Sequence, residues 1–172
     1  CLNNQPLFQL GPLDQGYWPD GLYTPPNEEA MRYDLEVIKG LGCNMLRKHI
    51  KVEPARYYYD CDRLGLIIWQ DMLSGGKEVG DVTSFLTILW GSRRRDRNYR
   101  YAGREAAEAR NDYQRELKEM VDHLHNFACI GVWVPFNEGW GQFDAKATAE
   151  WLKGYDPTRL VDHASGWFDQ GG

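Results

Sequence analysis

The sequence predicts an α/β fold built around a parallel sheet. Short apolar runs alternate with amphipathic helical segments along the whole chain. The runs are almost continuously apolar, which is typical of strands that are buried on both faces of a parallel sheet. Polar or aromatic residues follow the end of each run, where ligands bind in parallel α/β proteins. Together these observations predict alternating strands and helices joined by right-handed crossovers.

Five apolar runs are expected to form the strands. They are residues 7–10, 44–49, 66–72, 130–136 and 160–164.

The helix after the first run has clear start and stop signals. Asn27 is expected to cap it, and Glu28 and Glu29 suit the positive end of the helix dipole. Gly40 or Gly42 is expected to end it. Its apolar stripe consists of Met31, Leu35, Ile38 and Leu41.

Three further helices are predicted in the same way. Pro54 suits the first turn of a helix that stops at Gly65. Apolar residues at helical spacing predict a longer helix over about 105–126, and a fourth over about 145–153. One connection, about 73–104, is far longer than the usual loop of such folds, so we expect an inserted functional or disordered loop in a single domain of 172 residues.

Composition excludes several classes of function. The net charge of −5 argues against nucleic acid as a partner, because phosphate binding needs a basic face. The basic run at 93–100 could be a phosphate or RNA patch, but a solvated loop is the favoured interpretation. No apolar stretch approaches the length of a membrane span, so no membrane partner is expected. The four cysteines show no metal-ligand spacing, and we expect no metal and no cofactor.

The polar residues at the strand ends predict the kind of barrel. Each strand brings charged, amide or aromatic groups to one rim, as the active site of a (β/α)8 barrel requires. A flavodoxin-like sheet would concentrate them at one switch point, and no glycine-rich phosphate loop is present. Aromatic residues beside carboxylates and amides suit a sugar, although they also suit loops packed onto the barrel. The aromatic residues assigned to this rim are Tyr17, Trp18, Trp90, Trp140 and Trp167.

Three segments together resemble a known family. They are "LDQGYWPDG" near the start, "NMLRKHIKVEPARYYYDCDRLGLIIWQDM" and "VWVPFNEGWGQFD". They resemble the catalytic barrel of glycoside hydrolase family 2, which contains β-galactosidases, β-mannosidases and β-glucuronidases. The resemblance spans nearly the whole chain and implies a partial (β/α)8 barrel with about five of its eight strands.

The resemblance implies a retaining mechanism with two carboxylates. Glu138 would be the general acid/base, Asn137 would bind the sugar 2-hydroxyl, and Arg47 would support the nucleophile. His49 resembles a sugar-contacting histidine, although one residue separates it from the arginine where better-known members have two. Glu138 alone could instead be a carboxylate in the first turn of a helix.

The chemistry of a general acid suggests apolar surroundings for Glu138. A glutamate that donates a proton near neutral pH needs a pKa above its usual value of about 4.3. Phe136 and Trp140 are expected to supply this by desolvation.

Three further residues complete the candidate substrate site. Asp71 ends the third strand, where a loop-capping role competes with sugar binding, and Trp140 and Trp167 follow the fourth and fifth strands.

By the resemblance, the nucleophile is a glutamate at the end of a seventh strand, which this chain lacks. We therefore expect the remainder of a longer parent chain as a partner, a carbohydrate as substrate, and an isolated fragment without enzymatic turnover. A homo-oligomer stays open. Two other interpretations also stay open at this point: a catalytically inactive carbohydrate-binding relative, and a non-enzymatic α/β scaffold module.

Overall fold

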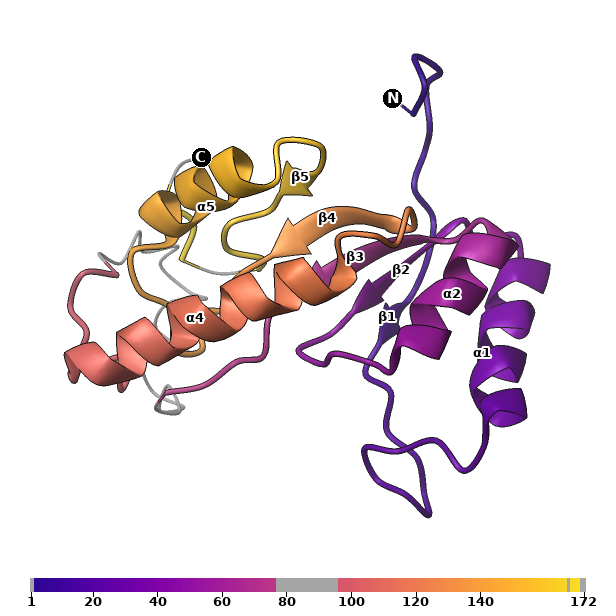
Figure 1. The fold of residues 1–172 in the computed structure, drawn as a ribbon, viewed down its shortest axis with the longest axis horizontal. Helices are drawn as coiled ribbons and strands as arrows, with labels where there is room; N and C mark the ends of the chain where they lie inside the picture. The colour runs from indigo at the N-terminus through magenta and orange to yellow at the C-terminus, as the bar shows by residue number, and fades with distance from the viewer. Residues whose placement is uncertain (1, 77–95, 167, 171–172) are drawn as a thin grey trace.

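The computed structural model describes residues 2–76, 96–166 and 168–170. It contains one parallel sheet whose strands lie in the order in which they occur along the chain (Figure 1). The strands are β1 (Leu13–Asp14), β2 (Met45–Lys48), β3 (Ile67–Asp71), β4 (Ile130–Val134) and β5 (Leu160–Val161). Every neighbouring pair is parallel. A helix follows each of the first four strands, although after β3 it comes only beyond the long connection, and this order is part of a (β/α)8 barrel, as the sequence predicts.

The helices begin and end close to the predicted positions. They are α1 (Glu28–Gly40), α2 (Ala55–Leu64), α4 (Ala107–Leu124) and α5 (Ala145–Tyr155). Asn27 caps α1 by accepting a hydrogen bond from the Ala30 amide at 2.7 Å. Gly65 ends α2 in a left-handed conformation, which glycine adopts at little cost. Leu41 is 76% exposed and lies outside the apolar stripe, because α1 has already ended there.

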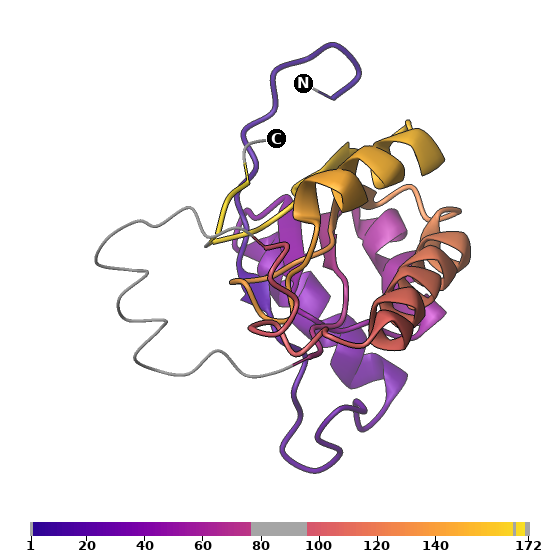
Figure 2. The same ribbon diagram turned by 90° about the vertical axis from the view of Figure 1, so that its left-hand side faces the viewer.

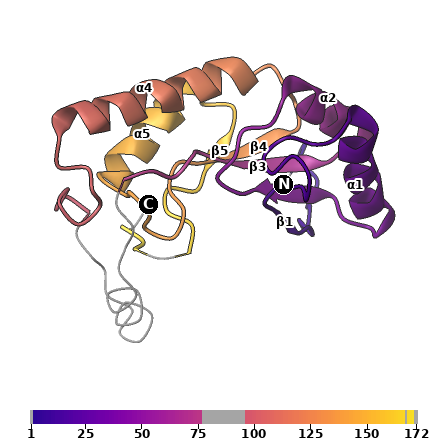
Figure 3. The same ribbon diagram turned by 90° about the horizontal axis from the view of Figure 1, so that it is seen from below.

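These helices cover one face of the sheet (Figure 3). The core lies between that face and the helices, and Leu46, Ile68 and Trp133 of the sheet are fully buried in it. Tyr113 of α4 donates a hydrogen bond to the Pro135 carbonyl, which ties this helix to the segment after β4. The opposite face of the sheet carries alternate residues such as Arg47 and Trp69, which are only partly buried in this chain.

The start of α5 is held by residues that lie far away in the sequence. Asp144, the residue before the helix, makes no capping hydrogen bond, and the Ala145 amide donates instead to the Asp96 carboxylate at 2.7 Å. Tyr99 donates to Asp144 at 2.8 Å. The described end of the basic run therefore packs against α5, and residues 93–95 lie outside the described part.

The first predicted strand was placed too early. Residues 7–10 are largely exposed, and the sheet ladder begins only at Leu13, opposite Arg47. Hydrogen bonds from Asn44 hold the earlier segment beside β2 without forming a strand: its amide donates to Leu10 and its side chain to Phe8. Figure 2 shows this N-terminal segment extending beyond the sheet at the end opposite the loop that precedes α1.

The predicted insertion at 73–104 falls mostly on residues 77–95, which lie outside the described part. Cys61 and Cys129 are buried, and burial raises the pKa of both thiols, as expected of structural cysteines. Within the described ranges, no helix is long and apolar enough to cross a membrane.

Candidate active site

Arg47 links the ends of four strands at the carboxyl rim of the sheet. It ends the inward-facing side of β2, and its guanidinium reaches Asp71 at the end of β3 through two hydrogen bonds of 2.9 Å. It also donates to the Asn137 side chain at 2.7 Å and to the Ser165 hydroxyl. Since Asn137 follows β4 and Ser165 follows β5, one side chain joins groups that are up to 118 residues apart.

Asp71 is fully buried beneath this guanidinium. Its side chain is 0% exposed, whereas that of Arg47 is 20% exposed. Burial raises the pKa of Asp71 above its usual value, although the hydrogen bonds and charge of Arg47 and the Ile50 amide act in the opposite direction. With both oxygens occupied, Asp71 faces Arg47 and not the open rim.

The segment after β4 carries the predicted asparagine and glutamate. Asn137 pairs with Ser165 in a parallel bridge beyond the regular strands. The Glu138 amide donates to the Ser165 carbonyl at 2.8 Å, and the Ser165 amide donates to Phe136 at 3.0 Å. The backbone of Glu138 is left-handed, with φ of 51°. This turn lifts Glu138 out of the strand at the carboxyl end of the sheet.

The surroundings of Glu138 differ from the sequence expectation. Its side chain is exposed, while Asn137 beside it is buried. Phe136 does not cover it, because that ring stacks on Tyr113 at a centroid distance of 5.2 Å, in the core under α4. Trp140 is 39% exposed. The described residues therefore place Glu138 at an open rim and do not form the expected apolar pocket around it.

The remaining predicted residues are placed as follows. His49 is partly buried near Asp71, and its ring nitrogen lies 3.5 Å from the Gln15 side chain. The Trp140 amide donates to the Asn137 carbonyl at 3.0 Å, so the indole belongs to the same turn as Glu138. Trp167, like Trp90, lies outside the described residues.

A group of buried charges that was not predicted from the sequence lies behind the rim. Lys48 points to the helix side of the sheet, where it contacts Asp14 at 3.0 Å and Glu53. Lys51 contacts Glu53 at 2.8 Å and donates to the Gly16 carbonyl at 2.7 Å. These bonds connect the loops after β1 and β2. The signal was present in the sequence, because Lys48 follows Arg47 and must point to the opposite face.

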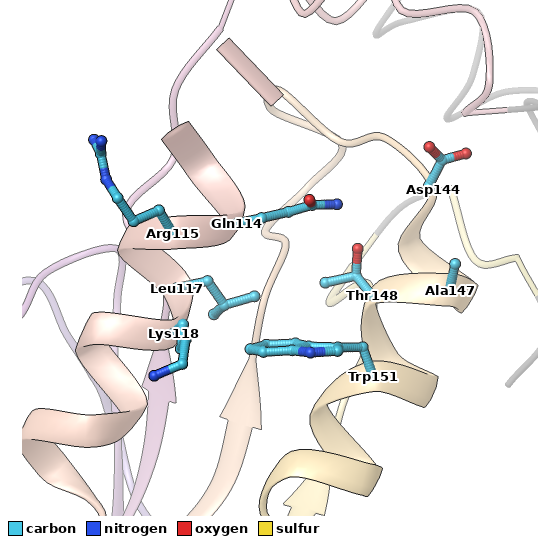
Figure 4. Close-up of a pocket in the computed structure, with 8 residues that line it drawn as sticks. All are labelled: Gln114, Arg115, Leu117, Lys118, Asp144, Ala147, Thr148 and Trp151. Atoms are coloured by element: carbon cyan, nitrogen blue, oxygen red, sulfur yellow. The ribbon is translucent and has the colours of Figure 1, made fainter. Parts of the chain in front are cut away.

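A cavity of about 490 Å³ lies away from the rim, between α4 and α5 (Figure 4). In Figure 4 the Trp151 ring extends from α5 toward α4, where Leu117 faces it. The basic residues on its α4 side have acidic partners on the same helix: Arg115 contacts Asp112 at 3.1 Å, and Lys118 contacts Asp122 at 2.6 Å. Among the residues that the structure describes, no group of three acidic, histidine or cysteine side chains could hold a metal ion.

The geometry agrees with a comparison against known families. Residues 26–170 match the model of the TIM barrel domain of the family 2 glycosyl hydrolases. The chain belongs to glycoside hydrolase family 2. This match includes Arg47, Asp71, Asn137, Glu138 and Ser165, so the linked rim residues all fall inside the family domain.

Individual relatives share only about a quarter of their residues with this chain. A β-galactosidase of Pectobacterium atrosepticum is 24% identical over 172 residues, which is 96% of this chain. The chain spans only 12% and 14% of the lengths of the two curated relatives that it matches.

Two solved structures have the same fold as this chain. The β-D-mannosidase of Dictyoglomus thermophilum matches 95% of this chain and 19% of its own, with a TM-score of 0.68 and 22% identity. A β-glucuronidase of Parabacteroides merdae, solved with glycerol in its active site, matches 92% of this chain and 18% of its own, with a TM-score of 0.64 and 19% identity.

Proposed function

We propose that the protein containing this chain hydrolyses terminal β-glycosidic bonds with retention of anomeric configuration, and that Glu138 is its general acid/base. Asn137 and Arg47 position the sugar and the reacting groups beside it. His49, Trp140 and Trp167 are the further residues to which we assign sugar binding. Asp71 acts through Arg47 and not by touching the sugar.

One observation carries this proposal. Asn137, adjacent to Glu138, is fixed by Arg47 at 2.7 Å at the carboxyl end of a parallel sheet of this family. Active sites of such barrels lie at that end, on residues from several different strands. A buried amide held by a charged donor, with an exposed carboxylate next to it, supports ligand binding and proton transfer on neighbouring residues.

The open position of Glu138 fits the proposed chemistry. A retaining enzyme needs a second carboxylate about 5 Å from the acid/base, on the other side of the glycosidic bond. By the family resemblance that carboxylate comes from a later strand, outside these 172 residues. We therefore propose that the chain by itself has no enzymatic turnover, and that Glu138 becomes enclosed only when the other strands and a substrate are present.

Glu138 would transfer a proton in each of the two steps of this reaction. As a protonated acid it gives its proton to the departing glycosidic oxygen while the second carboxylate bonds to the anomeric carbon. As a carboxylate it then takes a proton from the water that releases the sugar. The relatives suggest the substrates to try first, which are aryl β-galactosides, β-glucuronides and β-mannosides.

The test is the variant Glu138→Gln in the full-length protein. Turnover of the best of these aryl glycosides should fall by roughly 10²–10⁴-fold, the usual contribution of a general acid/base. Proton NMR of the unmodified enzyme should show the β-anomer as the first product. Glu150→Gln on the exposed side of α5 is a matched control, and should keep full activity.

Two results would contradict the proposal. Full activity of Glu138→Gln would remove Glu138 from the chemistry, and an α-anomer as first product would exclude retention. A protein that binds sugars with the same affinity in both forms but cleaves none would be the inactive carbohydrate-binding relative.

A further inference from the structure

We propose that Ser165 is a positioning residue that fixes the Arg47 guanidinium and the Glu138 backbone relative to each other. The proposal rests on the proposed function, since it concerns the same site. Ser165 lies past the end of β5 and is partly buried.

The side chain of Ser165 holds Arg47. Its hydroxyl accepts a hydrogen bond from Nη1 of the guanidinium. Asp71 binds the other edge of the guanidinium, through Nε and Nη2, and Nη2 also donates to Asn137. Within the part of the chain that the structure describes, Ser165 is the only hydrogen-bond acceptor of Nη1. Removing the hydroxyl therefore frees that nitrogen, while Asp71 still binds Nε and Nη2.

The main chain of Ser165 holds the turn that contains Glu138. Its carbonyl accepts from the Glu138 amide at 2.8 Å, and its own amide donates to Phe136 at 3.0 Å. These two bonds bracket Asn137, which pairs with Ser165 in the parallel bridge. The left-handed conformation of Glu138, at φ of 51°, is unfavourable for a residue with a side chain, so it needs such support from its surroundings.

The two roles meet in one residue. A shift of Ser165 moves the acceptor for Arg47 and the acceptor for the Glu138 amide together. The next residue, Gly166, packs closely under Glu138, because a Cβ there would lie 3.3 Å from the Glu138 Cγ. The spacing between the Arg47 guanidinium and Glu138 is therefore set from the segment after β5, and small errors in such spacing lower rates strongly.

The kinetic test compares Ser165→Ala, Ser165→Cys and Ser165→Thr in the full-length protein. Alanine and cysteine should each lower kcat about tenfold with little change in KM, since cysteine keeps the volume but is a weak acceptor. Threonine should restore most of the rate. Cysteine also serves if the alanine variant does not fold. Ser74→Ala, at a partly buried serine in the segment after β3, is the matched control and should not change kcat.

A double-mutant cycle tests whether Ser165 affects kcat through Arg47. Arg47→Lys cannot form the fork, so adding Ser165→Ala to it should cost almost nothing more. Additive losses would overturn the proposal, and so would an unchanged kcat in both Ser165→Ala and Ser165→Cys.

Crystal structures of the full-length protein and of Ser165→Cys separate this proposal from the proposed function. We expect the Arg47 guanidinium to be displaced or disordered in the variant. If the unmodified protein cleaves no β-glycoside, the proposed function fails, and the position of Arg47 still decides the role of Ser165. An Arg47 in the same place in both structures would overturn it.

Discussion

Arg47 and Asp71 form a two-pronged ion pair across β2 and β3, with both hydrogen bonds at 2.9 Å. The pair brings a fully buried carboxylate under a partly exposed guanidinium. Burial of such a carboxylate is costly unless its partner is well placed. The cost is visible in the raised pKa of Asp71. We interpret the pair as a device that fixes Arg47 at the rim more than as a source of stability.

Asp71→Asn tests this interpretation. The amide keeps the shape but turns an NH2 group toward a guanidinium donor, so Arg47 loses one of its two hydrogen bonds to residue 71. Activity of the full-length protein should fall at least tenfold, while the loss of stability stays within about 1–3 kcal/mol because the buried charge is removed as well. Steady-state kinetics and thermal unfolding measure the two effects.

Asp112→Asn on α4 is the matched control for this variant, and should change neither quantity. Unchanged kinetics in Asp71→Asn would show that Arg47 keeps its place without the pair.

The turn after Glu138 should not tolerate a larger residue at Gly139. This glycine has φ of +75°, and a Cβ there would lie 2.1 Å from the Phe168 ring, which is buried. Gly139→Ala should therefore destabilise the turn and lower activity, since the ring and the backbone cannot both stay in place. Gly154→Ala in α5 is the control, because no atom lies within 4 Å of its added methyl group and alanine favours a helix. Equal melting temperatures for the two variants would refute the close packing.

The buried Asp156 gives a pH-dependent prediction. Burial opposes its ionisation, yet hydrogen bonds from Thr158, Trp133 and Arg159 lower the pKa of Asp156 to about 2. A carboxyl group with a lowered pKa in the folded state stabilises the fold above its unfolded pKa of about 3.9. That stabilisation disappears as the pH falls through about 2.

Asp156→Asn should thus be less stable than the unmodified protein by about 2 kcal/mol at pH 7. The difference in melting temperature should shrink steadily between pH 4 and pH 2. A difference that stays constant over this range would assign the effect to packing and not to charge.

The sequence predicted most of the fold from local signals. Apolar runs located β2 to β5, and Asn27 located the start of α1. The first strand was misplaced because the run at 7–10 is apolar but exposed in this chain. Apolar spacing also located the start of α5, but not the contact that holds it, since the Ala145 amide donates to Asp96, 49 residues earlier in the chain.

The candidate site was predicted only as a set of strand ends. Parallel topology brings Arg47, Asp71 and Asn137 to one rim, and this follows from the order of the runs. Which of them pair depends on register and side-chain direction, which short apolar runs do not define. Phe136 illustrates this, because its ring packs under α4 and not beside Glu138. Ser165 was one of several small residues after the last run, with no local mark of its contact to Arg47.

The most direct test of the central claim is the dependence of kcat/KM on the leaving group. For a series of aryl β-glycosides of the sugar that the full-length protein hydrolyses, the unmodified enzyme should show a shallow dependence on the acidity of the phenol, because Glu138 protonates the departing oxygen. Glu138→Gln should keep much of its kcat/KM on the most acidic phenols, which leave without a proton, and lose kcat/KM steeply on the others, although its turnover falls on all of them because the second step still lacks its base. Parallel dependences in the two proteins would contradict the assignment of Glu138 as the proton donor.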